Sequence, residues 1–421
     1  MALDDIPLQV DELHAARRSL RIALVTETYP PEVNGVARTL HQVVEGLRER
    51  HHDLQLIRPR QQRDDEADVA ERFHEVLMRG LPVPRYPQLK MGMPARRSLL
   101  KLWSLQRPDL VHIATEGPLG WSALQAAQHL RLPVASDFRT NFHAYSRHYG
   151  VGWLNKPIVA YLKRFHNQCQ VTMVPTRALM DELAHYGFRN LRVLGRGVDT
   201  RAFDPAHRSD ALRAAWGAGP DTLVLLHVGR IAPEKNLGAV VETFRRVQAH
   251  GQDVRLVLVG DGPARASVAA MAPEAVFCGM QTGEALAAHY ASGDALLFPS
   301  LTETFGNVTT EALASGLAVS ACDRAAAGQL IRSGQNGHLV PVDRATADGF
   351  SAATTTWLMA QPDAESAWQS GSRLRREARE TALGLSWDSV LDSLEHSLLA
   401  VARGETAAAA RPVGALEAVN R

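Results

Sequence analysis

The sequence has few cysteines and no cysteine pattern. Its three cysteines, Cys169, Cys278 and Cys322, are a sparse, odd set, which excludes a disulfide framework and a cysteine-based metal site. It also lacks any stretch approaching about 18 uncharged apolar residues, so no transmembrane helix is predicted. Residues 1–20 contain no run that resembles a signal peptide. We therefore expect a cytoplasmic protein in a reducing compartment, with peripheral contact to the inner membrane face left open.

The sequence also lacks an excess of charge of either sign. The 46 Lys and Arg residues oppose 45 Asp and Glu residues, which gives a net charge of +1 and no basic field that would draw in nucleic acid, so no nucleic-acid partner is expected. No Asp-x-Asp motif lies in a suitable loop and no His/Cys cluster is present, so we expect no metal and no cofactor. What the chain does contain is an ordinary enzyme composition and enough length for two or three domains.

Short apolar runs alternate with helical patterns along most of the chain. The first run, residues 22–25, is typical of a buried parallel strand, and apolar residues recur at helical spacing after a turn-rich loop at 29–35. Further strands are predicted at 54–57, 109–113, 133–136, 171–174 and 192–194, and after a connector at 223–228, 254–259, 275–278, 295–298, 317–321 and 338–340. This alternation predicts an α/β protein with two doubly wound, Rossmann-like halves.

The halves define the expected domains. Residues 1–20 are expected to be a leader, 21–200 a first domain and 201–386 a second, with an amphipathic helix at about 387–403 and a flexible tail at 404–421. Because doubly wound sheets bind ligands at the carboxyl ends of their strands, two facing halves predict a central cleft.

Two glutamates follow a buried strand that ends at Phe298. Glu303 is expected in the polar loop over the sheet edge, and Glu311 about one turn into a helix that starts near Gly306 or Asn307. Helix N-termini suit phosphate, and carboxylates accept hydrogen bonds from paired hydroxyls such as those of a sugar or ribose. From the residues alone, a solvated loop glutamate and an ordinary helical glutamate remain an equal alternative.

Two cations flank another strand-to-helix loop. Arg230 and Lys235 follow the strand at 223–228, and Asn236 is expected to be the N-cap of the next helix. Such cations can neutralise a pyrophosphate, although solvated loop charges would look the same. Gly260 and Gly262 occupy a similar turn, where glycine serves either the approach of a ligand or the turn itself, and the same holds for Asn34 and Gly35.

Two further segments have open interpretations. Residues 136–149 are dense in polar and aromatic groups and fit a loop lining the cleft, with His143 as a candidate; an aromatic helix packed on a neighbour is the alternative. The basic, apolar stretch 85–107 can lie on an anionic membrane surface, or it can be a solvated helix face.

Taken together, these segments resemble the family-4 retaining glycosyltransferases with the GT-B fold over about residues 21–401. The variant around Phe305-Gly306-Asn307 looks most like the branch of glycolipid mannosyl-, glucosyl- and sulfoquinovosyltransferases. The motifs that carry the resemblance are Tyr29-Pro30-Pro31, Asn34-Gly35-Val36, Gly229-Arg230, Glu234-Lys235-Asn236, Gly260-Asp261-Gly262-Pro263, Glu303-Thr304-Phe305-Gly306-Asn307 and Glu311-Ala312-Leu313-Ala314-Ser315-Gly316.

The resemblance implies a role for each motif residue. Arg230 and Lys235 would hold the donor pyrophosphate, Glu303 would contact the donor sugar, and Glu311 would bind the ribose hydroxyls. The late helix would cross back to the first domain. The remaining residues expected at the substrate site are Asn34, Gly35, Gly260, Gly262, Phe305, Gly306 and Asn307.

One position departs from the family pattern. Where the family has a histidine in a Phe/Tyr-His-Thr motif, this sequence has Phe138-Arg139-Thr140. Arginine stays protonated and cannot serve as a general base, but it can stabilise negative charge on a departing phosphate. We therefore expect an electrostatic role for Arg139 near the reacting centre, with His143 as a candidate to compensate.

The expected function is transfer of a hexose of mannose or glucose type, with retention, from a nucleoside diphosphate sugar to a hydroxyl acceptor that includes glycolipids among its candidates. GDP-sugars and UDP-sugars both remain candidate donors, and the branch resemblance favours GDP-mannose. A sugar phosphorylase, a nucleotide-sugar epimerase and a non-catalytic sugar-nucleotide-binding subunit remain alternatives.

Overall fold

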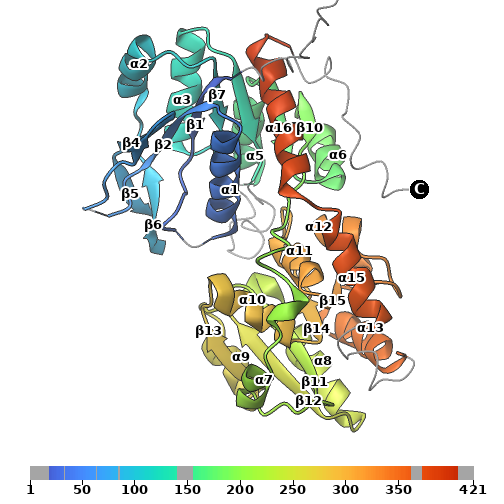
Figure 1. Cartoon of the computed structure of the whole chain (residues 1–421). Helices are drawn as coiled ribbons and strands as arrows, with labels where there is room; N and C mark the ends of the chain where they lie inside the picture. Colours follow the sequence, from blue (N-terminus) through green and yellow to red (C-terminus); the bar gives the residue numbers. More distant parts are fainter. Residues whose placement is uncertain are drawn as a thin grey trace, which may run out of the picture.

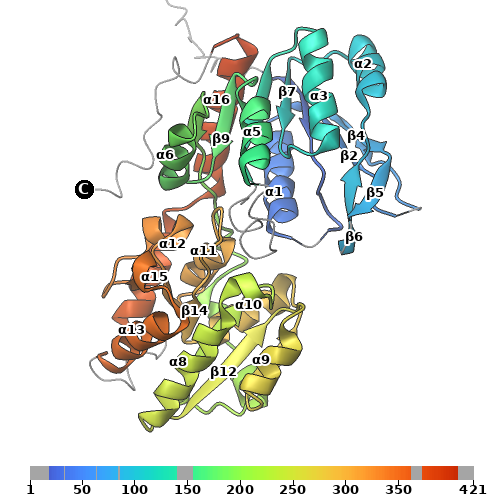
Figure 2. The same cartoon turned by 180° about the vertical axis from the view of Figure 1, so that it is seen from behind.

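The computed structural model describes residues 19–32, 34–62, 64–83, 86–139, 155–361 and 372–405. The predicted tail beyond residue 405, most of the predicted leader and His143 therefore lie outside the described residues. Two α/β bodies are stacked one above the other, and a late helix runs back along the first (Figures 1 and 2). This is the GT-B arrangement that the sequence predicted.

An eight-stranded sheet forms the centre of the first body. Its strand order is β10-β9-β8-β7-β1-β2-β4-β3, and every pair is parallel except β3 with β4. A separate antiparallel hairpin, β5–β6, lies beside it. The strands are β1 Arg21–Val25, β2 Asp53–Pro59, β3 Val69–Ala70, β4 Phe73–Met78, β5 Gly80–Val83, β6 Tyr86–Gly92, β7 Leu110–Ile113, β8 Val134–Asp137, β9 Val171–Val174 and β10 Leu191–Val193. The helices are α1 Gly35–Glu49, α2 Arg96–Leu105, α3 Pro118–His129, α5 Asn155–His166 and α6 Arg177–His185.

A six-stranded parallel sheet forms the centre of the second body, with the order β13-β12-β11-β14-β15-β16. Its strands are β11 Leu223–Val228, β12 Val254–Val259, β13 Val276–Gly279, β14 Ala295–Phe298, β15 Ala318–Cys322 and β16 Gly337–Val340. The helices of this part of the chain are η2 Pro205–His207, α7 Asp210–Ala215, η3 Pro233–Lys235, α8 Leu237–Ala249, α9 Arg265–Met271, α10 Gly283–Ser292, α11 Asn307–Ala314, α12 Ala325–Leu330, η4 Val342–Arg344, α13 Ala347–Met359, α15 Arg373–Leu383 and α16 Trp387–Ala402.

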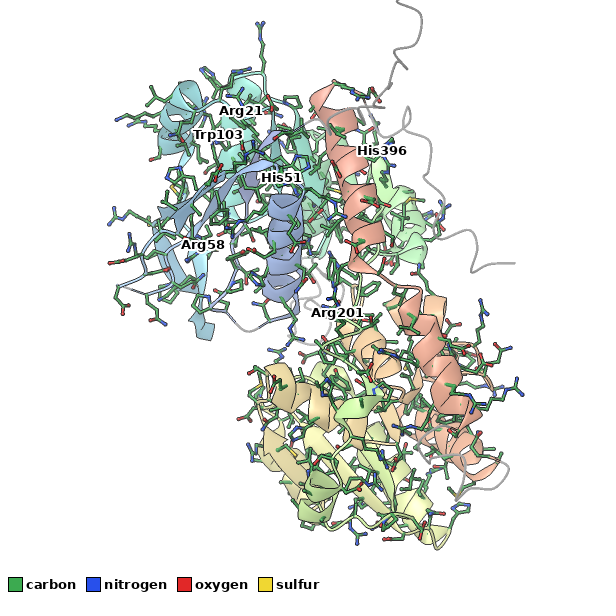
Figure 3. All side chains as sticks on the ribbon, in the orientation of Figure 1. Arg21, His51, Arg58, Trp103, Arg201 and His396 are labelled. Carbon is green, nitrogen blue, oxygen red and sulfur yellow. The ribbon has the colours of Figure 1, made fainter. Side chains whose placement is uncertain are left out.

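Alternate residues of the first strand enter two different cores. Ile22 and Leu24 pack with α1 and α16, whereas Ala23 and Val25 pack on the opposite side with α2 and α3. Both faces of the sheet are therefore covered, as the continuous apolar run at 22–25 predicted. Trp103 of α2 is fully buried in the second of these cores (Figure 3).

The chain crosses twice between the two bodies. The connector after β10 leads to the second body, and α16 returns to pack on α1. Leu391 of α16 lies so close to Gly46 of α1 that a Cβ on Gly46 would be 2.2 Å from Leu391 Cδ1. The two crossings touch, because Val198 N donates to Leu385 O at 3.0 Å and a Cβ on Gly197 would lie 2.7 Å from Trp387 Cα. Arg201 lies close to this junction (Figure 3).

Two local interpretations are refined by the structure. The stretch 85–107 comprises β6 and then α2, and α2 is not a fully solvated helix face, because it buries Leu99 and Trp103 in the core. Asn236 stands at the N-cap position of α8 as predicted, but its side chain makes no capping hydrogen bond, and its backbone is left-handed (φ +53°) where η3 ends. Asparagine tolerates this conformation better than most residues, which accounts for its presence there. Among the described residues, none of the helices has both the length and the apolar character needed to span a bilayer.

Candidate active site

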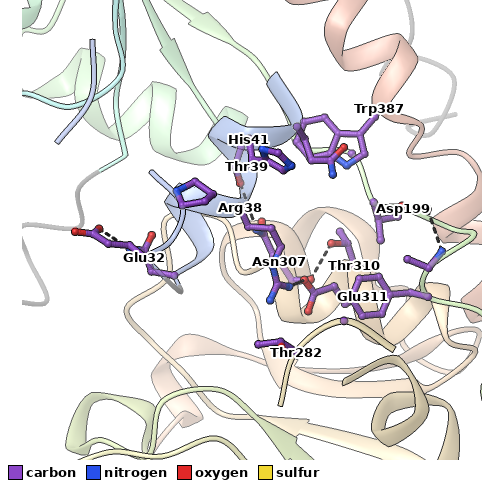
Figure 4. A pocket seen from close by; sticks show the side chains of 18 of the residues that line it. Glu32, Arg38, Thr39, His41, Asp199, Thr282, Asn307, Thr310, Glu311 and Trp387 are labelled. Carbon is purple, nitrogen blue, oxygen red and sulfur yellow. Dashed lines mark hydrogen bonds and ion pairs between the residues drawn. The ribbon is translucent and has the colours of Figure 1, made fainter. Parts of the chain in front are cut away.

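A cavity of about 380 Å³ opens between the two bodies (Figure 4). Both bodies line it, together with the connector and the start of α16. Its polar and charged lining includes Glu32, Asn34, Arg38, Thr39, His41, Asp199, Thr282, Asn307, Thr310 and Glu311. The cleft expected from two facing sheets is therefore present, and it contains three of the predicted site residues, Asn34, Asn307 and Glu311.

Two helix N-termini converge at this cavity. Asn34 caps α1 through a hydrogen bond from Ala37 N to Asn34 Oδ1 at 2.8 Å, and α11 starts at Asn307 after Gly306, whose φ is +88°. A Cβ on Gly35 would lie 3.7 Å from Asn307 Nδ2. Neither first turn contains an acidic residue, so the positive ends of two helix dipoles meet at this cavity. Such an arrangement favours an anion such as a diphosphate.

Glu311 is almost fully buried, at 6% exposure. Its Oε1 accepts a hydrogen bond from Arg38 Nη1 at 2.6 Å, and its Oε2 accepts one from the Tyr290 hydroxyl at 2.8 Å. Burial raises the pKa of Glu311, and the Arg38 guanidinium opposes that rise. Glu311 is thus a buried carboxylate with fixed orientation, one turn into α11 as predicted.

Glu303 and Lys235 form an ion pair, so the structure brings these two predicted residues together. Both side chains are 17% exposed. Although burial raises the pKa of Glu303, Lys235 outweighs burial and holds that pKa below its ordinary value. His227 of β11 adds no charge to this pair, because burial lowers its pKa to about 4 and keeps it neutral. The result is an ionised, oriented carboxylate at the edge of the second sheet.

Arg230 is paired with Glu234 rather than with Glu303. In the described part of the chain, Glu303, Lys235 and Arg230 are not among the residues that line the 380 Å³ cavity. They belong to the loops that follow β11 and β14, which are neighbouring parallel strands of the second sheet. These loops therefore lie at the carboxyl ends of the strands, where α11 begins.

The predicted glycines have a packing role that the sequence left open. A Cβ on Gly260 would lie 2.0 Å from Gly229 O, and one on Gly262 would lie 2.4 Å from Ile231 O. Both have positive φ, so contact between neighbouring loops already requires glycine there. Phe305 is buried in the second core, and its carbonyl accepts from Ala326 N at 2.8 Å. A ligand-binding role for these three residues stays a prediction.

Arg139 belongs to a buried cluster at the end of β8. Its Nε donates to Asp137 Oδ2 at 2.9 Å, Nη2 contacts the same oxygen, and Nη1 has no hydrogen-bond partner among the described residues. His112 Nε2 lies 3.1 Å from Asp137 Oδ1. Burial raises the pKa of Asp137, but Arg139 and then His112 outweigh it and hold that pKa far below its ordinary value. Burial, followed by the neighbouring Arg139, lowers the pKa of Arg196 to about 9. The cluster therefore holds the positively charged Arg139 guanidinium in a fixed position.

Replacing Arg139 tests its electrostatic role. We expect Arg139→Ala to lower sugar transfer about tenfold or more, and Arg139→Lys to retain part of the rate because it keeps the charge. Circular dichroism at the assay temperature would verify folding, since the alanine variant leaves the buried Asp137 without its paired guanidinium. If both variants kept full turnover, Arg139 would have no part in the reaction.

Several contributors to these clusters were not predicted from the sequence, among them Arg38, Tyr290 and Asp137. Arg38 meets Glu311 across 273 positions of sequence, and Tyr290 reaches the same carboxylate from α10. No local sequence pattern predicts such contacts. Asp137 has a usable local signal, because it directly follows the predicted strand 133–136 and precedes the Phe138-Arg139-Thr140 segment; in the structure it ends β8.

Comparison with known proteins agrees with this geometry. The model described as Glycosyltransferase Family 4 matches residues 33–202, and the one described as Glycosyl transferases group 1 matches residues 222–359. The chain is 33% identical to a GDP-mannose-dependent alpha-mannosyltransferase of Mycolicibacterium smegmatis, over 89% of this chain and 96% of the relative. It is 29% identical to the sulfoquinovosyl transferase SQD2 of Arabidopsis thaliana, over 78% and 63%.

Solved structures show the same architecture. A sucrose-phosphate synthase from Thermosynechococcus elongatus superposes with a TM-score of 0.71 at 17% identity, over 90% of this chain and 99% of that one. The enzyme WaaG, involved in lipopolysaccharide biosynthesis, gives a TM-score of 0.64 at 15% identity, over 89% and 99%. At this level of identity the likeness concerns the fold alone.

Proposed function

Because the chain belongs to the family 4 glycosyltransferases and is a hexosyltransferase, we propose that it transfers mannose from GDP-mannose to a hydroxyl acceptor with retention at the anomeric carbon. The observation that carries the choice of donor is the 33% identity, along nearly the whole chain, to a relative described as GDP-mannose-dependent. The converging helix N-termini beside Glu311 support a nucleoside diphosphate as the donor's leaving part.

Each part of the site has a role in this proposal. The amides at the N-termini of α1 and α11, with Arg230 and Lys235, stabilise the diphosphate as it leaves. Glu303, kept ionised by Lys235, accepts a hydrogen bond from a hydroxyl of the donor sugar. The acceptor oxygen forms a bond to the anomeric carbon, the bond from that carbon to the β-phosphate oxygen breaks, and the departing phosphate takes the acceptor's proton. Arg139 Nη1 adds positive charge near that phosphate.

A donor screen tests the proposal. GDP-mannose, GDP-glucose, UDP-glucose and UDP-galactose are compared by thermal shift and by hydrolysis without acceptor. Since a ligand that binds the native state stabilises it by about 2.7 kcal/mol at a hundred times its Kd, a true donor gives a clear shift in Tm. We expect the largest shift and the fastest hydrolysis with GDP-mannose; a preference for a UDP-sugar would overturn the donor assignment.

The same assay separates the alternatives. Consumption of inorganic phosphate with formation of a sugar phosphate would identify a phosphorylase, and an isomerised donor without acceptor would identify an epimerase. Donor binding with no turnover on any acceptor would identify a binding subunit. Inversion of the product's anomeric configuration, read by nuclear magnetic resonance, would exclude retention.

A lipid acceptor is the second element of the proposal. Residues 76–108 contain seven Lys and Arg and no Asp or Glu, and this stretch exposes Leu81, Met91 and Leu105 on the hairpin and α2. Exposed apolar side chains within an acid-free basic segment fit the surface of an anionic membrane, where each basic residue contributes about 1 kcal/mol.

Flotation with vesicles checks this contact. We expect binding to vesicles with about 30% phosphatidylglycerol and little binding to phosphatidylcholine alone. Replacing both arginines, Arg96→Glu with Arg97→Glu, should weaken the binding about tenfold or more. Both arginines are exposed, so folding is preserved. Binding that ignored the anionic lipid would contradict the proposed contact.

A further inference from the structure

Arg38 reaches across the cleft from one domain to the other. It lies in the first turn of α1, whereas its partner Glu311 lies on α11 of the second body, and Arg38 Nη1 is 2.6 Å from Glu311 Oε1. The Arg38 side chain is 43% exposed and lines the cavity, while that of Glu311 is 8% exposed (Figure 4). The first domain therefore supplies a cation to a buried carboxylate of the second.

The two oxygens of Glu311 have different donors. Arg38 occupies Oε1, and the hydroxyl of Tyr290 on α10 occupies Oε2 at 2.8 Å. Tyr290 is itself fully buried, and Phe203 packs against its ring edge-on at 5.6 Å between centroids. Burial and then Glu311 raise the pKa of Tyr290 well above its ordinary value, so it remains a hydroxyl donor.

Arg38 is consequently the charged group that offsets the burial of Glu311. Burial raises the pKa of this carboxyl, and Arg38 and Tyr290 are the two side chains that lower it. The other titratable groups lining the cavity are Glu32, His41 and Asp199. A protonated carboxyl has one acceptor oxygen fewer and donates instead, so it is a poor partner for two hydroxyls.

We propose that Arg38 is a positioning residue of the donor site: from the opposite domain, it keeps the Glu311 carboxylate ionised and oriented so that Glu311 accepts the ribose hydroxyls of the nucleotide. This inference rests on the proposed function, in which Glu311 binds the ribose. It adds that the ribose site is complete only when α1 faces α11. Arg38 acts through Glu311 and not on the phosphates.

Deoxynucleotides test the inference directly. The dissociation constants of GDP and 2′-deoxy-GDP are measured by calorimetry for the wild type, Arg38→Ala and Arg38→Lys. In the wild type the loss of one hydroxyl on a charged partner weakens binding about tenfold. We expect Arg38→Ala to bring the ratio of the two constants close to one, and Arg38→Lys to restore part of it.

A matched control lies on the same helix. Arg48→Ala also removes an arginine of α1, but Arg48 pairs with Glu45 of its own helix, so the wild-type ratio is expected. If Arg38 were a phosphate ligand instead, Arg38→Ala would weaken GDP and 2′-deoxy-GDP equally and leave their ratio unchanged. That result overturns the inference.

A pH series supplies a second readout. Since Arg38 lowers the pKa of a carboxyl that burial raises, removing Arg38 raises this pKa further. The accepting, ionised form is present above the pKa and is lost as the pH falls, so GDP binding to Arg38→Ala should weaken at a higher pH than binding to the wild type. An unchanged acid limb would contradict the inference.

The Glu311→Ala variant distinguishes a failure of the ribose assignment from a failure of the role assigned to Arg38. If this variant keeps the wild-type ratio for the two nucleotides, Glu311 does not bind the ribose, and both that assignment and the role of Arg38 are wrong. If Glu311→Ala removes the preference for the ribose hydroxyl but Arg38→Ala keeps it, the ribose assignment stands and only the role of Arg38 falls.

Discussion

Replacing Glu303 with alanine is expected to lower the rate of sugar transfer by at least about a hundredfold, since loss of one preorganised polar group at a reacting centre typically costs about 10²–10³ in kcat. Lys235 holds this carboxylate ionised at the edge of the second sheet. Glu303→Gln keeps the shape but loses the charge, so it separates position from electrostatics. The measurement is transfer of labelled sugar at saturating donor.

The control for Glu303 is an exposed glutamate of the same domain. Glu274→Ala, at the surface between α9 and β13, should leave the rate unchanged. Circular dichroism and thermal unfolding must show that each variant is folded, because Glu303→Ala leaves Lys235 without its carboxylate. A wild-type rate in folded Glu303→Ala, or in Glu311→Ala, would falsify the site assignment.

Replacing Asp294 is expected to have the largest effect on stability. This residue is 1% exposed and is paired with three arginines: Arg213 at 2.9 Å, Arg208 at 3.1 Å and Arg375 at 3.4 Å. Its Oδ2 also accepts from Val224 N at 2.8 Å. Burial lowers the pKa of Arg375 to about 10, and Asp294 opposes this. Removing the shared carboxylate leaves buried positive charges uncompensated, which costs about 3–5 kcal/mol.

Thermal unfolding measures this effect. For a domain of this size, that loss corresponds to a decrease in Tm of roughly 10 °C for Asp294→Asn. Asp348→Ala is the matched control, because Asp348 also pairs with an arginine, Arg246, but its side chain is 83% exposed. Exposed pairs contribute about 0–1 kcal/mol, so this variant should unfold near the wild type. Equal Tm values for both variants would show that the buried cluster does not stabilise the domain.

The sequence predicted the strands that are buried on both faces. Residues 171–174, 223–228, 254–259 and 295–298 were predicted with the bounds that the structure has, because a strand covered on both faces is a continuous apolar run. The missed strands, β3 to β6, lie at the edge of the first sheet or in the hairpin. These strands lack a continuous apolar run: β3 has only two residues, β4 contains His74 and Glu75, and β6 contains Pro87 and Lys90.

The candidate site was predictable where its signal is local. Glu303, Lys235 and Asn307 stand beside a strand end or a helix start, so position along the chain indicates their place in the fold. Arg38 lies in an ordinary helical pattern, and its contact with Glu311 exists only because two domains face each other. The packing role of Gly260 likewise depends on a neighbouring loop that the sequence does not identify.

The paired crossings between the domains determine how the enzyme can move. A single connecting strand would act as a swivel with several degrees of freedom, but here two segments are fastened side by side by the Val198–Leu385 hydrogen bond and by Trp387 against Gly197. Two adjacent connections permit a hinge rotation mainly about the line that joins them. The N-termini of α1 and α11 would then separate and return along one fixed arc, so each turnover brings Arg38 back to the same register with Glu311.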